Sequence, residues 1–268
     1  MPTRQSGDTS LLRIGCAMWA NRAWVGRWFP EDTAPGRELE AYASWCTTVE
    51  GNTTFYATPD PATIHHWAEQ VPESFRFCFK LPRAITHERR LRNCAEELTS
   101  FLRRIDALAP NLGPVQIQLP ASFGPAGMDA LQHYVAQLSS AFQWAIEVRH
   151  PDFFAGGDAE RPLDDFLAAK GINRVILDSR ALFAAPPETE AEREAHEAKP
   201  RVPVRAVATA DQPLIRLIGR TDAAASLEMW EPWFPKLAAW MDAGLSPHVF
   251  AHTPDNRDAP ELARAVWT

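Results

Sequence analysis

Residues 144–154, with the sequence WAIEVRHPDFF, give the clearest indication of the fold. The stretch begins with the apolar composition of a strand, yet it places Glu147, Arg149 and His150 where a core strand carries aliphatic side chains. Pro151 cannot donate a ladder hydrogen bond, so we expect a strand that ends at His150 and opens into a loop. Since side chains alternate along a strand, Glu147 and Arg149 share one face. They form either a buried ion pair or a ligand site at the carboxyl end of a parallel strand.

The composition is that of a soluble globular protein. Of its 268 residues, 46% are hydrophobic and 23% are charged. A formal net charge of −7 and a pI near 5.6 argue against a general affinity for nucleic acid, although they allow a local basic pocket. No apolar run approaches the roughly 20 residues of a membrane span. We therefore expect no membrane association and a cytoplasmic location.

The N-terminus and the cysteines give no sign of secretion or of a structural metal. Residues 1–10 (MPTRQSGDTS) are polar, and we expect them to form a disordered leader. The cysteines show no CxxC pair and no Cys/His spacing of the zinc type, which predicts free thiols. The chain also lacks the GxGxxG, GxxxxGK[ST] and GxSxG motifs. We expect neither a cofactor nor a resident metal.

Short strand-like segments recur along the chain with helix-like segments between them. The expected strands lie at 11–16, 47–56, 75–81, 115–119, 144–150, 174–177, 214–218 and 248–251. A strand about every 30 to 40 residues, each followed by a helix, is typical of a TIM-like (β/α)8 barrel in the α/β class. We expect a single domain over residues 11–268. It is interrupted by an excursion at 182–211, either a surface helix or a mobile segment.

Four motifs in this order resemble the DUF72 (YecE-like) family. They are EGNTTFY at 50–56, FKLPRAITHERRL at 79–91, IQLPASF at 117–123 and EVRHPDFF at 147–154. The resemblance spans nearly the whole chain and implies a TIM-barrel-like fold, but it carries no established reaction.

The positions that match the family motifs include most of the polar residues at the expected strand ends. They are Trp19, Glu50, Asn52, Thr54, Phe55, Tyr56, Lys80, Pro82, His87, Gln118, Pro120, Glu147, Arg149, His150, Asp178, Arg216 and Gly219. The chain departs from the family pattern late, at Ile218, His252 and Thr253. These departures border the expected barrel mouth, so the resemblance implies that ligand specificity differs here.

Basic and acidic side chains are expected to meet at the carboxyl ends of the strands. The basic ones are Lys80, Arg149 and Arg216, and the acidic ones are Glu50, Glu147 and Asp178. Buried charges must be paired and hydrogen-bonded, which a closed structural network also achieves. We favour an open cluster that binds an anion, because the interior layers of such barrels are normally aliphatic.

Our preferred hypothesis is an enzyme, a hydrolase, lyase or isomerase, that acts on a small anionic or hydroxylated substrate. The acid/base set is Glu50, Glu147 and Asp178. The expected ligand-binding residues are Trp19, Asn52, Tyr56, Lys80, His87, Gln118, Arg149, His150, Arg216 and His252. Two alternatives stay open: a non-catalytic ligand- or partner-binding protein, and a metal-dependent phosphodiesterase or nuclease. The sequence does not indicate the oligomeric state.

Several of these residues also have a purely structural interpretation. Taken one at a time, His87 and His150 fit loop-stabilising or hydrogen-bonded core histidines better than they fit ligands. Trp19 and Tyr56 belong to an aromatic group that forms either a wall for a sugar or base, or simple packing between loop and barrel. A metal site would need Glu50, Glu147, Asp178 and a histidine together, whereas divalent-metal sites usually show tighter groupings of ligands along the sequence.

Overall fold

The computed structural model describes residues 11–154 and 156–267, so the expected leader at 1–10 lies outside the described residues. Within these ranges the chain forms eight short strands, each close to an expected position. They are β1 (Arg13–Cys16), β2 (Thr48–Gly51), β3 (Arg76–Phe79), β4 (Val115–Gln118), β5 (Trp144–Glu147), β6 (Asn173–Asp178), β7 (Leu214–Ile218) and β8 (His248–His252).

The strands pair in parallel to give an α/β fold. Among the described residues, six strands form one curled sheet in the order β1-β8-β7-β6-β5-β4, which makes a half-barrel. The other two, β2 and β3, form a second parallel sheet. Parallel strands bring their carboxyl ends to the same edge, which is where ligand sites of such folds are built.

The two sheets meet at both of their edges. Between β3 and β4, the Leu81 amide donates to the Gln116 carbonyl at 2.9 Å and the Gly113 amide to the Phe77 carbonyl at 2.9 Å. Between β1 and β2, the Thr47 amide donates to the Ile14 carbonyl at 3.1 Å. These hydrogen bonds hold the small sheet against both edges of the large one.

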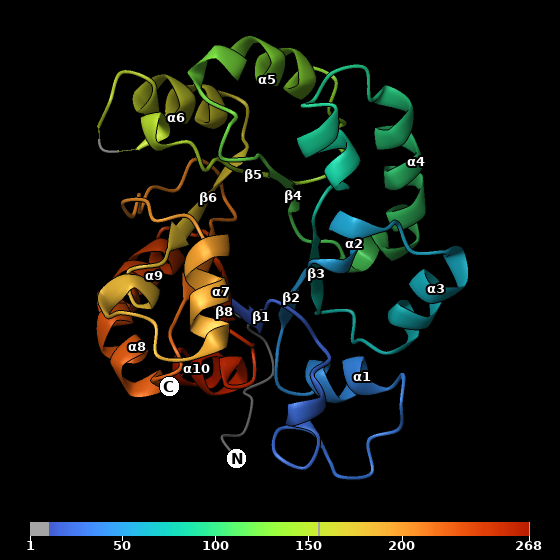
Figure 1. Cartoon of the computed structure of the whole chain (residues 1–268). Helices are drawn as coiled ribbons and strands as arrows, with labels where there is room; N and C mark the ends of the chain where they lie inside the picture. The colour runs from blue at the N-terminus through green and yellow to red at the C-terminus, as the bar shows by residue number, and fades with distance from the viewer. Residues whose placement is uncertain (1–10, 155, 268) are drawn as a thin grey trace.

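Helices surround the strands on the outside (Figure 1). The α-helices are α1 (Glu38–Ala43), α2 (Thr53–Tyr56), α3 (Pro61–Glu69), α4 (Ala95–Ile105), α5 (Met128–Val135), α6 (Glu160–Ala169), α7 (Glu190–Ala198), α8 (Ala223–Trp230), α9 (Trp233–Asp242) and α10 (Ala259–Ala265). A π-helical turn, η2 (Ala84–Glu88), and several 3₁₀ turns complete the connections. The sequence patterns did not predict α8.

One expected strand is too long. We expected a strand over 47–56, because Thr and aromatic residues are enriched in strands, but the strand ends at Gly51 and α2 follows. The Thr54 hydroxyl contacts the carbonyls of Gly51 at 3.1 Å and Lys80 at 2.7 Å. Tertiary hydrogen bonds therefore turn the chain where local propensity favours extension.

The expected excursion at 182–211 contains a 3₁₀ turn, η6 (Leu182–Ala184), and helix α7. Thr189 caps the start of α7 by accepting from the Glu192 amide at 3.1 Å. Ala195 of α7 belongs to a small apolar cluster with Leu177 and Ile218 at the ends of β6 and β7. The excursion is therefore packed onto the carboxyl ends of the strands.

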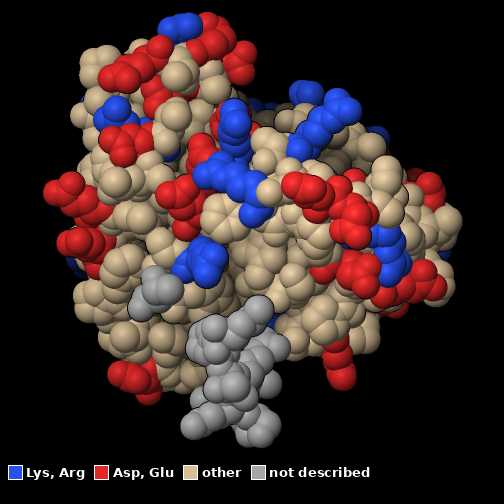
Figure 2. Space-filling model, turned by 90° about the horizontal axis from the view of Figure 1, so that it is seen from below, with Lys and Arg blue, Asp and Glu red and all other residues tan. Residues whose placement is uncertain are grey.

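The surface carries both signs of charge. On the face shown in Figure 2, Asp and Glu side chains are widely spread, and Lys and Arg side chains lie among them in separate groups. Among residues 11–154 and 156–267, no helix combines the length and apolarity needed to span a bilayer.

Candidate functional site

Side-chain alternation places a polar layer above an apolar layer inside the sheets. The lower layer consists of Cys78, Ala145, Val175, Leu214 and Phe250, which form one buried cluster. The upper layer is polar and begins two residues further along the strands. It contains Lys80, Glu147, Arg216 and His252, together with Glu50 of β2 and Gln118 of β4. The period of two along each strand therefore brings these charged groups together toward the carboxyl ends.

Arg216 lies at the centre of this polar layer. Its Nε is 2.6 Å from Glu50 Oε1, and its Nη1 donates to Glu147 Oε2 at 2.9 Å. All three side chains are at most 2% exposed. One guanidinium thus bridges carboxylates from two separate strands, and the planar fork of arginine suits this geometry.

Glu50 is engaged on both oxygens. Besides Arg216, it is contacted by Asn52 Nδ2 at 3.1 Å, His252 Nε2 at 3.4 Å and Lys80 Nζ at 3.7 Å. Burial alone would raise the pKa of Glu50, but the attraction of Arg216 and Lys80 outweighs it and holds the pKa well below its usual range. Glu50 is therefore ionised at neutral pH.

Glu147 is paired with two arginines. Arg149 Nε donates to Glu147 Oε1 at 2.5 Å, in addition to the contact from Arg216. Although burial opposes it, the attraction of Arg149 and Arg216 lowers the pKa of Glu147 to about 2. Within the described part of the chain, Arg149 uses its Nε for this ion pair, and no hydrogen bond or ion pair engages its Nη atoms.

Lys80 completes the layer beside Gln118. Its Nζ donates to Gln118 Oε1 at 2.9 Å, and the side chain is almost fully buried. Burial and the neighbouring Arg216 lower the pKa of Lys80 to about 7, against the attraction of Glu50 and Glu147. This amine therefore exchanges its proton near neutral pH.

A pocket of about 370 Å³ opens beside this layer. Its wall includes the predicted residues Trp19, Asn52, Tyr56 and His252, together with Lys199, which the sequence patterns did not indicate. Burial and Arg216 push the pKa of His252 well below its usual range, so the imidazole is neutral. His252, where the sequence departs from the family pattern, thus lines the pocket wall and contacts Glu50.

Lys199 reaches the pocket from the excursion. It follows the last residue of α7, and the next residue is anchored because Ser179 Oγ donates to the Pro200 carbonyl at 2.9 Å. Burial and Arg216 lower the pKa of Lys199 to about 8. Among the contacts of the described residues, none pairs the Lys199 ammonium with a carboxylate. Its only sequence signal was a lysine at the end of a charged run.

The structure does not bring Asp178 into this cluster, contrary to the sequence-based expectation. Asp178 accepts from Arg180 Nη2 at 2.7 Å and from Trp233 Nε1 of α9 at 2.7 Å. In the sheet register, Leu177 is the partner of Arg216, and Asp178 is the partner of Leu217. Because neighbouring residues on a strand face opposite sides, Asp178 points to the helices.

Two of the three predicted histidines, His87 and His150, lie outside the network. His150 caps a 3₁₀ turn, where its Nδ1 accepts from the Asp152 amide at 3.3 Å. His87 contacts Thr86 Oγ1 at 2.9 Å and packs edge-on against Phe55. Burial and the nearby Arg149 lower the pKa of His87. His87 thus lies within electrostatic reach of the site, whereas His150 stabilises a loop.

The metal hypothesis gains no support from this arrangement. It required Glu50, Glu147, Asp178 and a histidine to converge, and Asp178 lies on the other side of its strand. Among the described residues, no three His, Cys, Asp or Glu side chains are grouped so that they could hold a metal ion.

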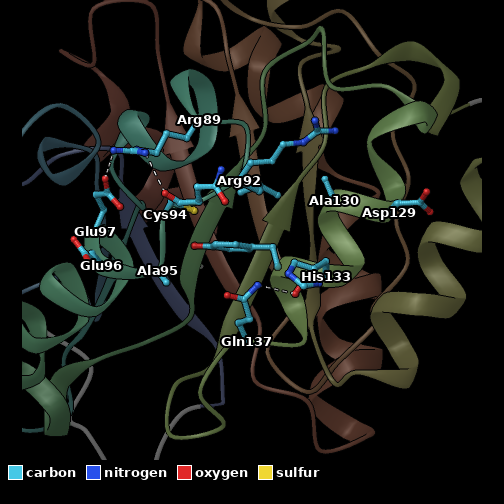
Figure 3. Close-up of a pocket in the computed structure, with 13 residues that line it drawn as sticks. Arg89, Arg92, Cys94, Ala95, Glu96, Glu97, Asp129, Ala130, His133 and Gln137 are labelled. Carbon is cyan, nitrogen blue, oxygen red and sulfur yellow. Dashed lines mark hydrogen bonds and ion pairs between the residues drawn. The ribbon is translucent and has the colours of Figure 1, made fainter.

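A larger pocket, of about 660 Å³, lies between the start of α4 and α5 (Figure 3). Arg89 is already paired there with Glu97 and with the Asn93 carbonyl, as the dashed lines in Figure 3 show. The Tyr134 hydroxyl is buried without a hydrogen-bond partner among the described residues and is out of a ligand's reach. The smaller pocket, whose wall includes the Glu50 contacts Asn52 and His252, is therefore the better candidate site.

Comparison with known proteins agrees with the motifs. The model of the family described as "Protein of unknown function DUF72" matches residues 13–268. The chain belongs to the DUF72 family. It is 45% identical over 257 residues to the UPF0759 protein YecE of Escherichia coli K12, a match that covers 96% of this chain and 92% of that protein. It is 29% identical over 177 residues to the UPF0759 protein YunF of Bacillus subtilis 168, covering 63% and 61% of the two chains.

Crystal structures of DUF72 family proteins share this fold. One from Thermotoga maritima superposes with a TM-score of 0.70 at 19% identity and covers 96% of this chain and 99% of its own. Another, from Enterococcus faecalis, gives 0.67 at 18% identity and covers 95% and 94%. The family and its fold are thus established, while these relatives assign no reaction to the pocket.

Proposed function

We propose that this DUF72 protein is an enzyme that acts on a small anionic, hydroxylated substrate held beside the buried Glu50–Arg216–Glu147 network. The observation that carries the proposal is Lys199, an ammonium group in the pocket wall with no carboxylate partner among the described residues. A partly buried, unpaired cation is unfavourable unless a counter-ion joins it. An anionic ligand supplies that counter-ion.

The charge balance of the site supports an anion. Four basic side chains, Lys80, Arg149, Lys199 and Arg216, surround the ionised Glu50 and Glu147 in the described structure. Positive charge therefore exceeds negative charge when both lysines are protonated. A cleft with one sign of charge in a low-dielectric wall attracts ligands of the other sign.

The roles within the site differ from those we expected. Glu50 and Glu147 are held ionised by several cations, so they are poor general acids and serve instead to position Arg216. Groups that titrate near the working pH make better acid–base catalysts. Lys80, with a pKa of about 7, and Lys199, with a pKa of about 8, meet this condition. We propose Lys199 as the proton-transferring group, since it lines the pocket.

We also propose that the two sheets act as one closed (β/α)8 barrel. The hydrogen bonds from β3 to β4 and from β1 to β2 support closure, although the pairing at these two junctions is sparse. In such a barrel the polar layer lies at the mouth formed by the loops that follow the strands, which is where catalytic residues of this fold gather.

We expect phosphate or sulfate to stabilise the wild-type protein and to lose this effect in Lys199→Gln. A ligand that binds only the folded state raises the free energy of unfolding by about 1.4 kcal/mol at ten times its dissociation constant. Glutamine keeps most of the side-chain length but removes the charge. Thermal unfolding at constant ionic strength, with chloride replaced stepwise by sulfate or phosphate, measures the effect.

The matched control is Lys170→Gln, which removes an exposed lysine at the end of α6. It should keep the full anion effect, because Lys170 is not part of the pocket wall. Equal anion stabilisation in wild type and Lys199→Gln, or none in wild type up to tens of millimolar, would refute the proposed site.

The affinity for sulfate should fall as the pH rises from 6 to 9. Sulfate keeps its charge over this range, while Lys80 and Lys199 lose their protons near pH 7 and 8. Above pH 8 the loss approaches about tenfold per pH unit for each proton taken up on binding. Titration calorimetry at three pH values measures it, and a constant affinity would contradict the assignment.

The lowered pKa values of Lys80 and Lys199 also affect the folding stability of the unliganded protein, which should rise with pH while the affinity for sulfate falls. The folded-state pKa of each lysine lies below the value of about 10.4 for an unfolded chain. Between pH 7 and 10 the unfolded state therefore binds more protons than the folded state, and these two lysines make stability increase with pH.

The second candidate function is a binding protein without turnover. It is favoured by the full engagement of Glu50 and Glu147 with cations, which leaves neither carboxylate free for acid–base chemistry. The two candidates differ in the fate of the ligand. Incubation of a bound ligand with stoichiometric protein, followed by NMR, shows conversion for an enzyme and unchanged ligand for a binding protein.

A further inference from the structure

Helix α2 and the residue before it contribute three side chains to the pocket wall, those of Asn52, Thr53 and Tyr56. Asn52, at the start of the helix, uses its amide nitrogen to contact the Ala17 carbonyl at 2.8 Å and Glu50 at 3.1 Å. Asn52 and the exposed Thr53 both line the pocket. Among the described residues, no hydrogen bond engages Asn52 Oδ1 or the Thr53 hydroxyl. These two oxygens can accept hydrogen bonds from a ligand's hydroxyl groups.

Tyr56, at the end of the same helix, is unusually exposed for an aromatic residue. Its side chain is 76% exposed although it lines the pocket, and Phe55 packs edge-on against it at a centroid distance of 5.2 Å. Trp19 lies in the same pocket wall and packs edge-on against Trp67, with their ring centroids 4.9 Å apart. The pocket therefore has an apolar, aromatic side in addition to Lys199.

These groups together suit one kind of molecule. Lys199 provides a positive charge for an anionic group, and Asn52 and Thr53 provide acceptors for hydroxyl groups. Tyr56 provides a flat surface against which the C–H face of a ring can stack. A pocket of about 370 Å³ falls in the size range of small-molecule sites.

We propose that the ligand of this pocket is a sugar that carries a phosphate or carboxylate group, with its ring against Tyr56 and its anionic group toward Lys199. This proposal rests on the proposed function, since it names the substrate class of the same site. It adds the sugar ring, which free phosphate and sulfate lack, and makes Tyr56 a specificity-determining residue.

The test measures thermal stabilisation and affinity for inorganic phosphate, for a panel of pentose and hexose phosphates and uronic acids, and for the same sugars without the anionic group. We expect at least one sugar phosphate or uronic acid to bind more tightly than phosphate, and the neutral sugars to bind more weakly. In Tyr56→Ala, we expect a roughly three- to tenfold loss of affinity for that anionic sugar and no change for phosphate.

The matched control is Phe234→Ala, which truncates another exposed aromatic residue, on α9 and not part of the pocket wall. It should leave all affinities unchanged. Because Tyr56 is largely exposed, its truncation should not impair folding, and circular dichroism checks this. If no anionic sugar in the panel binds better than phosphate, or if Tyr56→Ala has no effect, the sugar assignment fails while anion binding stands. If phosphate, sulfate and anionic sugars all fail to bind, the proposed function fails with it.

Discussion

Replacement of Arg216 by methionine is expected to destabilise the protein by about 3–5 kcal/mol. Arg216 is buried and pairs with both Glu50 and Glu147, so its loss removes a counter-charge from two carboxylates in the interior. Removal of one partner of a buried ion pair typically has this magnitude, because the remaining charge is desolvated and unpaired. The midpoint of thermal unfolding should fall by roughly 10 °C for a chain of this size.

The control for this experiment is an exposed ion pair of the same chemistry. Arg193 contacts Glu190 at 2.5 Å on the surface of α7, where both side chains are more than half exposed. Arg193→Met should change stability by less than about 1 kcal/mol, since exposed pairs contribute little. If Arg216→Met were as mild as Arg193→Met, the description of Arg216 as the centre of a buried ion-pair network would be wrong.

The second large effect is expected for Gly15→Ala, which tests the contact between β1 and β2. A Cβ atom at Gly15 would lie 1.9 Å from the Thr48 carbonyl oxygen and 2.7 Å from the Tyr42 hydroxyl. That hydroxyl accepts from the Cys16 amide at 2.6 Å and donates to the Thr48 carbonyl at 2.9 Å. Since backbone must shift, we expect a loss of about 3 kcal/mol or more.

Gly157→Ala is the matched control for this substitution. A Cβ atom there would lie 3.6 Å from the nearest atom, the Asp152 carbonyl oxygen, which is an ordinary contact. It should change the free energy of unfolding by no more than about 0.5 kcal/mol. Equal stability of the two variants would show that β1 and β2 do not approach as closely as described and would weaken the case for barrel closure.

Local patterns in the sequence predicted most of the polar layer. Side-chain alternation and the prolines and glycines that follow the strands predict which polar residues lie at the strand ends. The structure brings five of them together, namely Glu50, Lys80, Gln118, Glu147 and Arg216. This succeeded because a period of two fixes the facing of a side chain once the strand is recognised. The same alternation explains why the charged groups lie above an apolar layer.

The expectation for Asp178 failed because the facing of a side chain depends on where its strand begins and on its register. The strand that we expected at 174–177 is extended by one residue at each end, and its register sets Leu177 rather than Asp178 beside Arg216. A shift of one position reverses every side chain. The sequence contains no local signal that fixes this register.

Lys199 was missed for a different reason. Its position depends on how the 182–211 excursion folds, and that depends on long-range packing of Ala195 against Leu177 and Ile218. A charged run alone is equally typical of a solvated helix, so no local pattern distinguishes a lysine in the site from one on the surface. The same packing gives Ile218, one of the departures from the family pattern, a structural role, because its side chain lies in one buried cluster with Ala195 of α7.

The most direct test of the anion site is anomalous diffraction from crystals soaked in selenate. We expect a selenium peak from a selenate ion in the pocket formed with Asn52 and His252, with a selenate oxygen within hydrogen-bond distance of Lys199 Nζ, and no such peak in crystals of Lys199→Gln. Selenium bound only at surface arginines, with no peak in the pocket of the wild-type protein, would contradict it.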